Sequence, residues 1–258
     1  MSSLSVVMIV KNEAADLQSC LETVGFADEI VILDSGSSDD TVKIAKQCGA
    51  RVAVNAEWPG FGPQRQRAQA LAKSRWVLML DADERVTPDL AKEICQVIEQ
   101  DPVQHVFRLK RLSRCFGHYI RHGGWYPDEV VRLYPRASVG YGNQLVHESV
   151  QVPQDYKEVT LNADLLHLTY QHLPEYLAKS AQYSEAWSDQ CFAKGKRAGL
   201  GQAFLHGLGC FLKMYLFRAG FLDGRHGLLL ATLSAHSTFC KYVSLWLREQ
   251  NRETTGVN

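Results

Sequence analysis

Carboxylates directly follow buried-looking apolar runs in the first ninety residues. Asp81 and Asp83 stand one residue apart after the run Trp76–Leu80, and Asp34 follows the run Glu29–Leu33. Two carboxylates at this spacing can hold a divalent metal and a ribose hydroxyl together, because Mg²⁺ and Mn²⁺ prefer oxygen ligands and share their shell with substrate phosphates. The structural alternative is a solvated loop whose acidic residues cap the next helix. The pattern favours a metal and nucleotide site, and the capping loop stays open as its alternative.

The elements that must position these carboxylates alternate between strand-like and helix-like patterns. The predicted strands are Leu4–Val10, Glu29–Leu33, Arg51–Val54 and Trp76–Leu80. The predicted helices between them are Ala14–Val24, Val42–Cys48 and Gln64–Ser74. Such alternation indicates βαβ units and a mainly parallel sheet, whose ligand crevice lies beyond the carboxyl ends of the strands. We expect Glu13, Asp34, Asp81 and Asp83 to converge on that rim.

The pattern changes after residue 104. Shorter predicted strands, separated by Gly and Pro, suggest a mixed or antiparallel extension: His105–Leu112, Val130–Tyr134, Ser149–Val152 and Val159–Leu168. Beyond Pro174 the pattern is helical to about Leu247, with a break near 220–227. We therefore expect an α/β domain over 1–172, divided at 104/105, then a helical extension over 173–250 and a flexible tail over 251–258.

Composition excludes several classes of protein. The chain has 28 basic and 28 acidic side chains, and this balance argues against a protein built to coat nucleic acid. Seven cysteines without a C-x-x-C pair indicate reduced thiols and not a zinc site. The apolar start is interpreted as a strand and not as a signal peptide. No apolar stretch is long enough to predict a conventional membrane span.

Three ordered motifs resemble a known family. Val-Val-Met-Ile-Val-Lys-Asn-Glu (6–13), Ile-Val-Ile-Leu-Asp-Ser-Gly-Ser-Ser-Asp-Asp-Thr (30–41) and Leu-Met-Leu-Asp-Ala-Asp-Glu (78–84) resemble the inverting family 2 glycosyltransferases of the GT-A fold. The resemblance implies a nucleotide-sugar donor, usually UDP-linked, bound over 1–104. It places Asp34 near uracil, Asp81 near the ribose and Glu13 in the nucleotide pocket. Asp83 would hold Mn²⁺ or Mg²⁺ at the diphosphate, where the ion stabilises the leaving group.

Further motifs resemble one branch of that family. They are Trp-Pro-Gly-Phe-Gly-Pro-Gln-Arg (58–65), Gly-Gly-Trp-Tyr-Pro-Asp (123–128), Arg-Leu-Tyr (132–134) and Val-His-Glu (146–148). This branch includes the lipopolysaccharide inner-core β-1,4-glucosyltransferases, which implies transfer of glucose from UDP-glucose to an inner-core heptose. In the branch Lys-Asn follows the glutamine, whereas here Arg65 and Gln66 follow Gln64. Arg65 keeps the positive charge expected at the diphosphate, and Gln64 is assigned to the donor site with it.

The resemblance also implies an acceptor part over 105–172. Inverting transfer needs a carboxylate that takes a proton from the acceptor hydroxyl as it attacks the anomeric carbon. We predict that Asp128 is this base, with Glu129 as the alternative and an ordinary turn aspartate as the structural interpretation. Trp125 and Tyr126, just before it, are predicted to stack on the acceptor sugar.

Other polar residues receive weaker assignments. His147 and His167 are predicted as additional metal ligands, with hydrogen-bonded structural histidines as the alternative. Glu148 and Arg132 are assigned to the acceptor. The segment 105–122 carries five basic residues and no acidic one, namely Arg108, Lys110, Arg111, Arg114 and Arg121. Such a face suits acceptor phosphates or, alternatively, a solvated edge strand protected by its charges.

The C-terminal part suggests a location. Apolar residues recur at helical spacing: Phe204, Leu205, Leu208, Phe211, Leu212, Tyr215 and Leu216. Residues 194–225 hold six Lys or Arg and one acid, a local charge of +5. Cations beside an apolar helix suit an anionic membrane surface. We expect peripheral attachment to the cytoplasmic face of the inner membrane; packing on the catalytic domain or across a homodimer is the alternative.

Two rival functions remain open at this point. A sugar nucleotidyltransferase also places carboxylates and a metal beside a nucleotide, but it typically has a Gly-rich basic loop after the first strand, where this chain has Lys11, Asn12 and Glu13. A non-catalytic protein that binds saccharide or membrane needs no metal and tolerates the loss of Asp81 and Asp83.

Overall fold

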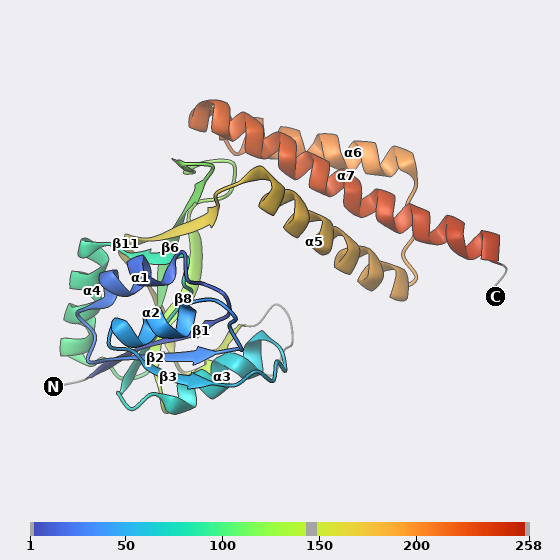
Figure 1. The fold of residues 1–258 in the computed structure, drawn as a ribbon. Coiled ribbons are helices and arrows are strands. Elements are labelled where there is room, and N and C mark those ends of the chain that lie inside the picture. The colour runs from blue at the N-terminus through green and yellow to red at the C-terminus, as the bar shows by residue number, and fades with distance from the viewer. Residues whose placement is uncertain (1–2, 143–148, 256–258) are drawn as a thin grey trace. The chain divides into compact units, whose positions relative to one another are not determined.

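The computed structural model describes residues 3–142 and 149–255, which divide into two compact units (Figure 1). The first comprises Met1–Leu112 and Asp128–His167, and the second comprises Ser113–Pro127 and Leu168–Asn258. The sequence analysis places the domain boundary at 172. The structure ends the first unit at His167 and assigns the segment 113–127 to the second.

The first unit is built on a mixed sheet. Its parallel part has the order β3-β2-β1-β4, with β1 Leu4–Val10, β2 Glu29–Asp34, β3 Arg51–Val54 and β4 Trp76–Leu80. The order continues as β8-β6-β11-β5, with β8 Asp128–Pro135, β6 His105–Cys115, β11 Lys157–Tyr170 and β5 Glu84–Val86. Strand β8 is antiparallel to both β4 and β6, and β11 is antiparallel to β5. The predicted parallel sheet with a mixed extension is confirmed.

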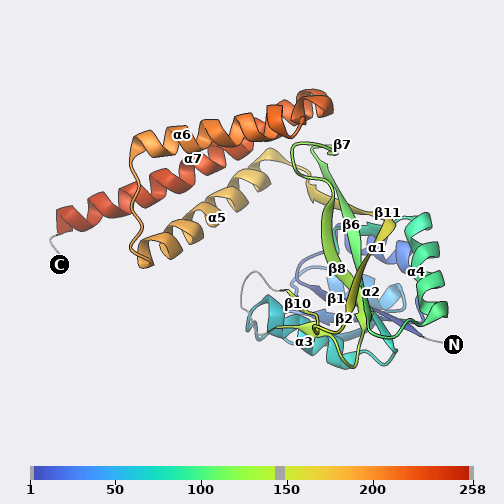
Figure 2. The same cartoon turned by 180° about the vertical axis from the view of Figure 1, so that it is seen from behind.

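Helices cover both faces of this sheet (Figures 1 and 2). They are α1 Leu17–Leu21, the 3₁₀ turn η1 Glu22–Val24, α2 Thr41–Gln47, α3 Phe61–Leu71 and α4 Pro88–Gln100. Successive side chains of a strand point to opposite faces. In β4, Leu78 accordingly joins a core cluster with α1, α2 and α4, while Met79 joins a second cluster with Ala68 of α3. Burial on both faces explains why these strands are continuously apolar.

Some predicted strand limits differ from the structure. Strand β11 extends beyond the predicted 159–168, and β6 continues to Cys115. The predicted strand over 149–152 is only Val150–Gln151, β10, which pairs with β9 Gly140–Tyr141. Three residues form β5 and two form β7, His118–Tyr119, which are too short to produce a recognisable alternation.

The second unit is mainly helical. Its elements are α5 Leu173–Ala193, α6 Leu200–Leu212, the π-helical η2 Lys213–Phe217, the 3₁₀ turn η3 Gly220–Asp223 and α7 Gly224–Thr255. Helix α6 approaches α7 closely at Gly207, where a Cβ atom would meet the Ala235 carbonyl oxygen at 3.2 Å. No helix in the described part of the chain is both long and apolar enough to cross a membrane.

Helix α7 continues to Thr255, into the predicted tail over 251–258. Ion pairs attach the end of α7 to its neighbours. Arg248 contacts Glu185 at 2.5 Å and Asp189 at 2.9 Å, both on α5. Arg197 contacts Glu249 at 3.0 Å.

One carboxylate ties the parallel strands together at their amino ends. Glu29 accepts hydrogen bonds from Ser5 Oγ at 2.5 Å, Arg51 Nη2 at 3.0 Å, and the backbone N–H groups of Lys73 at 2.5 Å and Ser74 at 3.2 Å. Burial opposes ionisation of this carboxyl, but the hydrogen bonds outweigh it and lower its pKa to about 2.

We predict that Glu29→Gln lowers the free energy of unfolding by about 1–3 kcal/mol at pH 7, because charged hydrogen bonds are lost. The folded pKa lies below the unfolded value, so the wild-type advantage is complete above pH 4.5 and is lost as pH falls towards 2. Urea denaturation from pH 7 to pH 3 measures it, with the exposed Glu57→Gln as control. If the difference in free energy of unfolding between wild type and Glu29→Gln did not change with pH, the lowered pKa of Glu29 would be contradicted.

Candidate active site

The carboxyl ends of β1, β2 and β4 meet at one rim of the sheet. Val10 pairs with Asp34 across β1 and β2, and Met8 pairs with Leu80 across β1 and β4. Asp81 therefore follows β4 beside the turns that follow β1 and β2.

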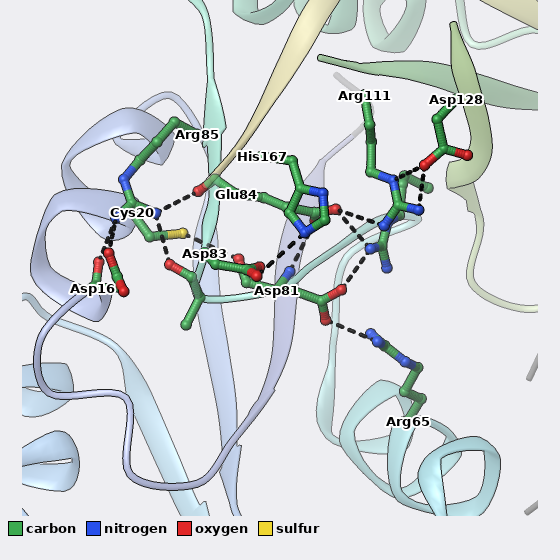
Figure 3. Close-up of polar contacts among 12 residues, drawn as sticks. Asp16, Cys20, Arg65, Asp81, Asp83, Glu84, Arg85, Arg111, Asp128 and His167 are labelled. Atoms are coloured by element: carbon green, nitrogen blue, oxygen red, sulfur yellow. Dashed lines mark hydrogen bonds and ion pairs between the residues drawn. The ribbon is translucent and has the colours of Figure 1, made fainter. Parts of the chain in front are cut away.

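Asp81 lies between two buried arginines (Figure 3). Its Oδ1 is 2.8 Å from Arg65 Nη2 of α3, and its Oδ2 is 2.6 Å from Arg132 Nη2 of β8. Each guanidinium is only 6% exposed. Although burial disfavours the charged form, Arg132 and Arg65 hold the pKa of Asp81 well below its usual range. Asp81 is thus a charged carboxylate whose position the fold determines.

Glu84 extends this arrangement into a chain of alternating charges. Its side chain is completely buried and contacts Arg132 Nη2 at 2.7 Å and Arg111 Nη1 at 3.6 Å, and it accepts the Asp81 N–H at 3.0 Å. Burial raises the pKa of the Glu84 carboxyl, although Arg132 opposes the rise. The chain runs Arg65, Asp81, Arg132, Glu84, Arg111, Asp128.

Asp128 is at the exposed end of this chain. Arg111, directly opposite it in the β6–β8 register, donates from Nε at 2.8 Å and from Nη2 at 2.5 Å, both to Asp128 Oδ2. The Asp128 side chain is 42% exposed, so Oδ1 remains for another partner. Glu129 points to the other face of β8 and accepts from Thr160 Oγ1 at 3.2 Å. Asp128, and not Glu129, is therefore joined to the chain of alternating charges, and it is the better candidate for the predicted base.

Asp83 and His167 lie side by side next to the network (Figure 3). Asp83 Oδ2 is 3.2 Å from His167 Nε2, which comes from β11, where His167 pairs with Glu84 of β5. A carboxylate and an imidazole nitrogen fit a divalent cation that keeps waters and substrate phosphates as its other ligands. No group of three or more His, Cys, Asp or Glu side chains among the described residues is arranged for a metal. His147, the third predicted ligand, and Glu148 lie outside the described residues.

Glu13 adds to the negative charge at this rim. Burial, together with the charges of Asp83, Asp16 and Asp81, raises the pKa of its carboxyl to about 7. Its N–H donates to Thr41 Oγ1 at 2.8 Å, which joins the turn after β1 to the turn after β2. A partly buried carboxyl surrounded by like charges is typical of a site that receives a cation.

Asp34 organises the turn that follows β2. Its Oδ1 accepts the N–H groups of Gly36 and Ser37, each at 3.0 Å, and its Oδ2 accepts from Ser37 Oγ. Gln64 is fully buried and donates to Ser35 Oγ at 2.9 Å. Its Oε1 has no partner within the described residues. These contacts show how the turn is held; the predicted roles of Asp34 and Gln64 towards the nucleotide stay predictions.

Three further residues are assigned to the acceptor from the sequence, namely Arg132, Trp125 and Tyr126. Arg132 is buried against Asp81 and Glu84, and its assignment to the acceptor stays a prediction that these contacts do not favour. Trp125 and Tyr126 belong to the second unit. There Trp125 packs against Tyr170, with ring centroids 6.4 Å apart, and Tyr126 lines a pocket.

Sequence reasoning did not assign two residues of the network, Glu84 and Arg111. Glu84 lies inside the Asp-Ala-Asp-Glu motif and Arg111 inside the basic segment, so both were visible. Their partners depend on the antiparallel registers of β11 with β5 and of β6 with β8, which no periodicity specifies.

A family model matches the part of the chain that contains most of this site. The model of the family "Glycosyl transferase family 2" matches residues 5–140, more than half of the chain. The match covers the turns after β1, β2 and β4 as well as Arg111, Asp128 and Arg132. The chain belongs to glycosyl transferase family 2, and the resemblance inferred from the three motifs is confirmed.

Relatives match along nearly the whole chain. An uncharacterized glycosyltransferase of Rickettsia prowazekii is 27% identical and covers 97% of this chain and 90% of its own. The lipopolysaccharide core biosynthesis glycosyltransferase LpsC of Rhizobium meliloti is 28% identical over 93% of both chains. Among solved structures, Mycobacterium tuberculosis glucosyl-3-phosphoglycerate synthase with Mn²⁺ and UDP-glucose is 28% identical, covers 44% of each chain and has a TM-score of 0.36.

We predict that Arg132→Gln destabilises the protein by about 3–5 kcal/mol, because it leaves the buried carboxyl of Glu84 and the partly buried carboxyl of Asp81 incompletely compensated. Equilibrium urea denaturation measures the change. Arg108→Gln, on β6 with a half-exposed partner in Glu158, serves as the control and should cost at most about 1 kcal/mol. Equal effects of the two substitutions would show that the buried pairs do not carry the stability assigned to them.

Proposed function

We propose that this glycosyltransferase moves glucose from UDP-glucose onto an inner-core heptose of lipopolysaccharide, or a related lipid-linked saccharide, with inversion at the anomeric carbon. The observation that carries the proposal is the continuous charge network from Asp81 to Asp128, beside the Asp83–His167 pair. The lipopolysaccharide acceptor is supported by the full-length similarity to LpsC.

The donor side of the mechanism rests on groups fixed before substrate binds. Asp81 keeps its charge between Arg65 and Arg132, and each of its oxygens retains a lone pair that can accept a ribose hydroxyl. Asp83 and His167 would hold Mn²⁺ or Mg²⁺, which when bound neutralises charge on the departing diphosphate. Because Asp81 is held by the protein, little reorganisation accompanies donor binding.

The acceptor side depends on Asp128. Oδ1 takes the proton of the acceptor hydroxyl while that oxygen forms its bond to the anomeric carbon and the bond to the UDP oxygen breaks. Arg111 holds Oδ2 and so fixes the direction of Oδ1. Attack from the side opposite to UDP inverts the anomeric configuration.

We predict that Asp128→Asn lowers kcat by roughly 10²–10⁴, because the base is lost, while UDP-glucose binding stays within about threefold of wild type. Release of UDP in the presence of acceptor measures kcat, and calorimetry measures donor binding. Glu129→Gln is the matched control on the same strand and should retain wild-type turnover.

Three outcomes would contradict the proposal. Loss of turnover in Glu129→Gln with normal turnover in Asp128→Asn would transfer the role of base to Glu129. Release of pyrophosphate instead of UDP would establish the sugar nucleotidyltransferase, and donor binding unaffected by loss of both Asp81 and Asp83 would favour the non-catalytic alternative.

We further propose that the second unit attaches peripherally to the anionic cytoplasmic face of the inner membrane. Helix α6 buries Ala203 and Gly207 but leaves Leu205 70% exposed, and Phe217 of η2 is 83% exposed. Further exposed apolar side chains occur in α6, η2, η3 and the start of α7, namely Phe204, Leu208, Leu216, Phe221, Leu222, Leu228 and Leu229. With the local charge of +5 over 194–225, this apolar surface is complementary to anionic lipid.

We predict that Leu205→Glu and Phe217→Glu each weaken binding to phosphatidylglycerol vesicles by at least about tenfold, since a buried Leu or Phe contributes about 1.5–3 kcal/mol. Vesicle sedimentation measures binding, and Leu177→Glu on α5 is the control. If light scattering instead shows a homodimer that both substitutions dissociate, with vesicle binding unchanged, the apolar surface is a subunit interface.

A further inference from the structure

The second unit contains a basic pocket of about 370 Å³. Its lining residues are Arg121, His122, Gly124, Tyr126, Pro127 and Arg218. They come from the loop before β8 and from the turn after η2. The volume is within the range of about 300–1,000 Å³ typical of small-molecule sites.

The lining residues that the structure describes include two arginines and no carboxylate. Arg218 is exposed, and its guanidinium has no acidic partner among the described residues. The guanidinium carbon of Arg121 lies 5.6 Å from the centre of the Tyr126 ring. Buried Asp223, behind the lining, accepts the His122 N–H at 2.8 Å and lies 3.0 Å from His122 Nδ1, which fixes the imidazole.

The loop is shaped to receive the Arg218 side chain. Gly123 and Gly124 have φ values of +69° and +84°, which favour glycine. The Gly123 N–H donates to the Arg218 carbonyl at 2.8 Å. A Cβ atom on Gly124 would lie 2.1 Å from Arg218 Nη1, so a larger residue at 124 would displace the guanidinium from this backbone. Glycine at 124 therefore gives the Arg218 side chain its place against the loop.

Two cations of the basic segment have acidic partners. Arg108 pairs with Glu158 at 2.5 Å, and Arg111 pairs with Asp128 at 2.5 Å. The predicted face for acceptor phosphates is thus partly neutralised along β6. The charge that the pocket offers to a phosphate comes first of all from Arg218.

The position of Arg218 in the chain indicates the kind of ligand. It directly follows Phe217, the most exposed of the large apolar side chains, and precedes exposed Phe221. Guanidinium groups bind phosphate through paired, charge-assisted hydrogen bonds, and Tyr126 offers a ring face to a sugar. We propose that this pocket binds a phosphate group carried at a membrane surface, on the acceptor saccharide or on a lipid headgroup; the saccharide case rests on the proposed function.

The test uses the full chain and two probes. The first is a soluble, delipidated core oligosaccharide that bears phosphate. Calorimetry compares its affinity with that of the same oligosaccharide after phosphatase treatment. The second is a pair of vesicles, phosphatidylglycerol against phosphatidylcholine. The variants are Arg218→Gln and Gly124→Ala, and Arg225→Gln, an exposed arginine outside the pocket, is the matched control. Thermal melts establish that each variant is folded.

We expect the wild type to bind the phosphorylated oligosaccharide at least tenfold more tightly than the phosphatase-treated one. Both pocket variants should lose that preference, and Arg225→Gln should keep it. If both pocket variants lose binding to phosphatidylglycerol but not to saccharide, the phosphate comes from lipid. If neither probe separates the folded pocket variants from the control, the proposal is overturned. UDP-glucose binding, measured in the same samples, tests the proposed function separately. If the wild type binds the phosphate probes but not UDP-glucose, the result contradicts the proposed function and not the phosphate pocket.

Discussion

The structure depends above all on two buried arginines that share one carboxylate. Removing a guanidinium from water without compensation costs several kcal/mol. Arg65 and Arg132 therefore require Asp81, and Arg132 also requires Glu84. This constraint fixes α3 and β8 against the end of β4. The same carboxylate that stabilises the fold is thereby presented, charged and oriented, at the rim where a nucleotide would bind.

The alternating charges extend this constraint to the acceptor side. Glu84 lies against Arg132 and Arg111, and Arg111 grips one oxygen of Asp128. Asp81 and the proposed base Asp128 are consequently parts of one network of hydrogen bonds and ion pairs. Asp83 and His167 stand just outside it, more exposed than Glu84, where a cation can retain water ligands. Preorganised charge of this kind suits a reaction in which charge develops on a leaving diphosphate.

Much of the parallel sheet could be predicted because its strands are buried on both faces and form uninterrupted apolar runs. Asp34 and Asp81 could be placed for the same reason, since each follows such a run. The partners of Asp81 could not be predicted. A period of two tells on which face Arg132 lies, but only the register of β8 against β4 and β6 shows that this face is buried beside Glu84. The sequence therefore did not indicate that Arg132 is buried, and its assignment to the acceptor stays a prediction.

The second unit shows a similar limit. Helical spacing identified its apolar segment, yet the position of the break depends on η2 and η3, where Arg218 carbonyl and side chain meet the glycine loop 123–124. Contacts between segments about a hundred residues apart in the chain do not produce a periodic pattern in the sequence. The C-terminal end of α7 likewise makes ion pairs with α5. Because its sequence is polar and shows no apolar periodicity, the sequence alone suggests a flexible tail there.

The central claim is that one glycosyl group is transferred by direct displacement with Asp128 as base. The most direct measurement is the anomeric configuration of the product, determined by proton NMR after incubation with UDP-glucose, Mn²⁺ and a heptose-terminated core acceptor. The account predicts a β-linked glucoside formed from the α-linked donor, with UDP as the second product. An α-linked product would contradict a single displacement and with it the role assigned to Asp128.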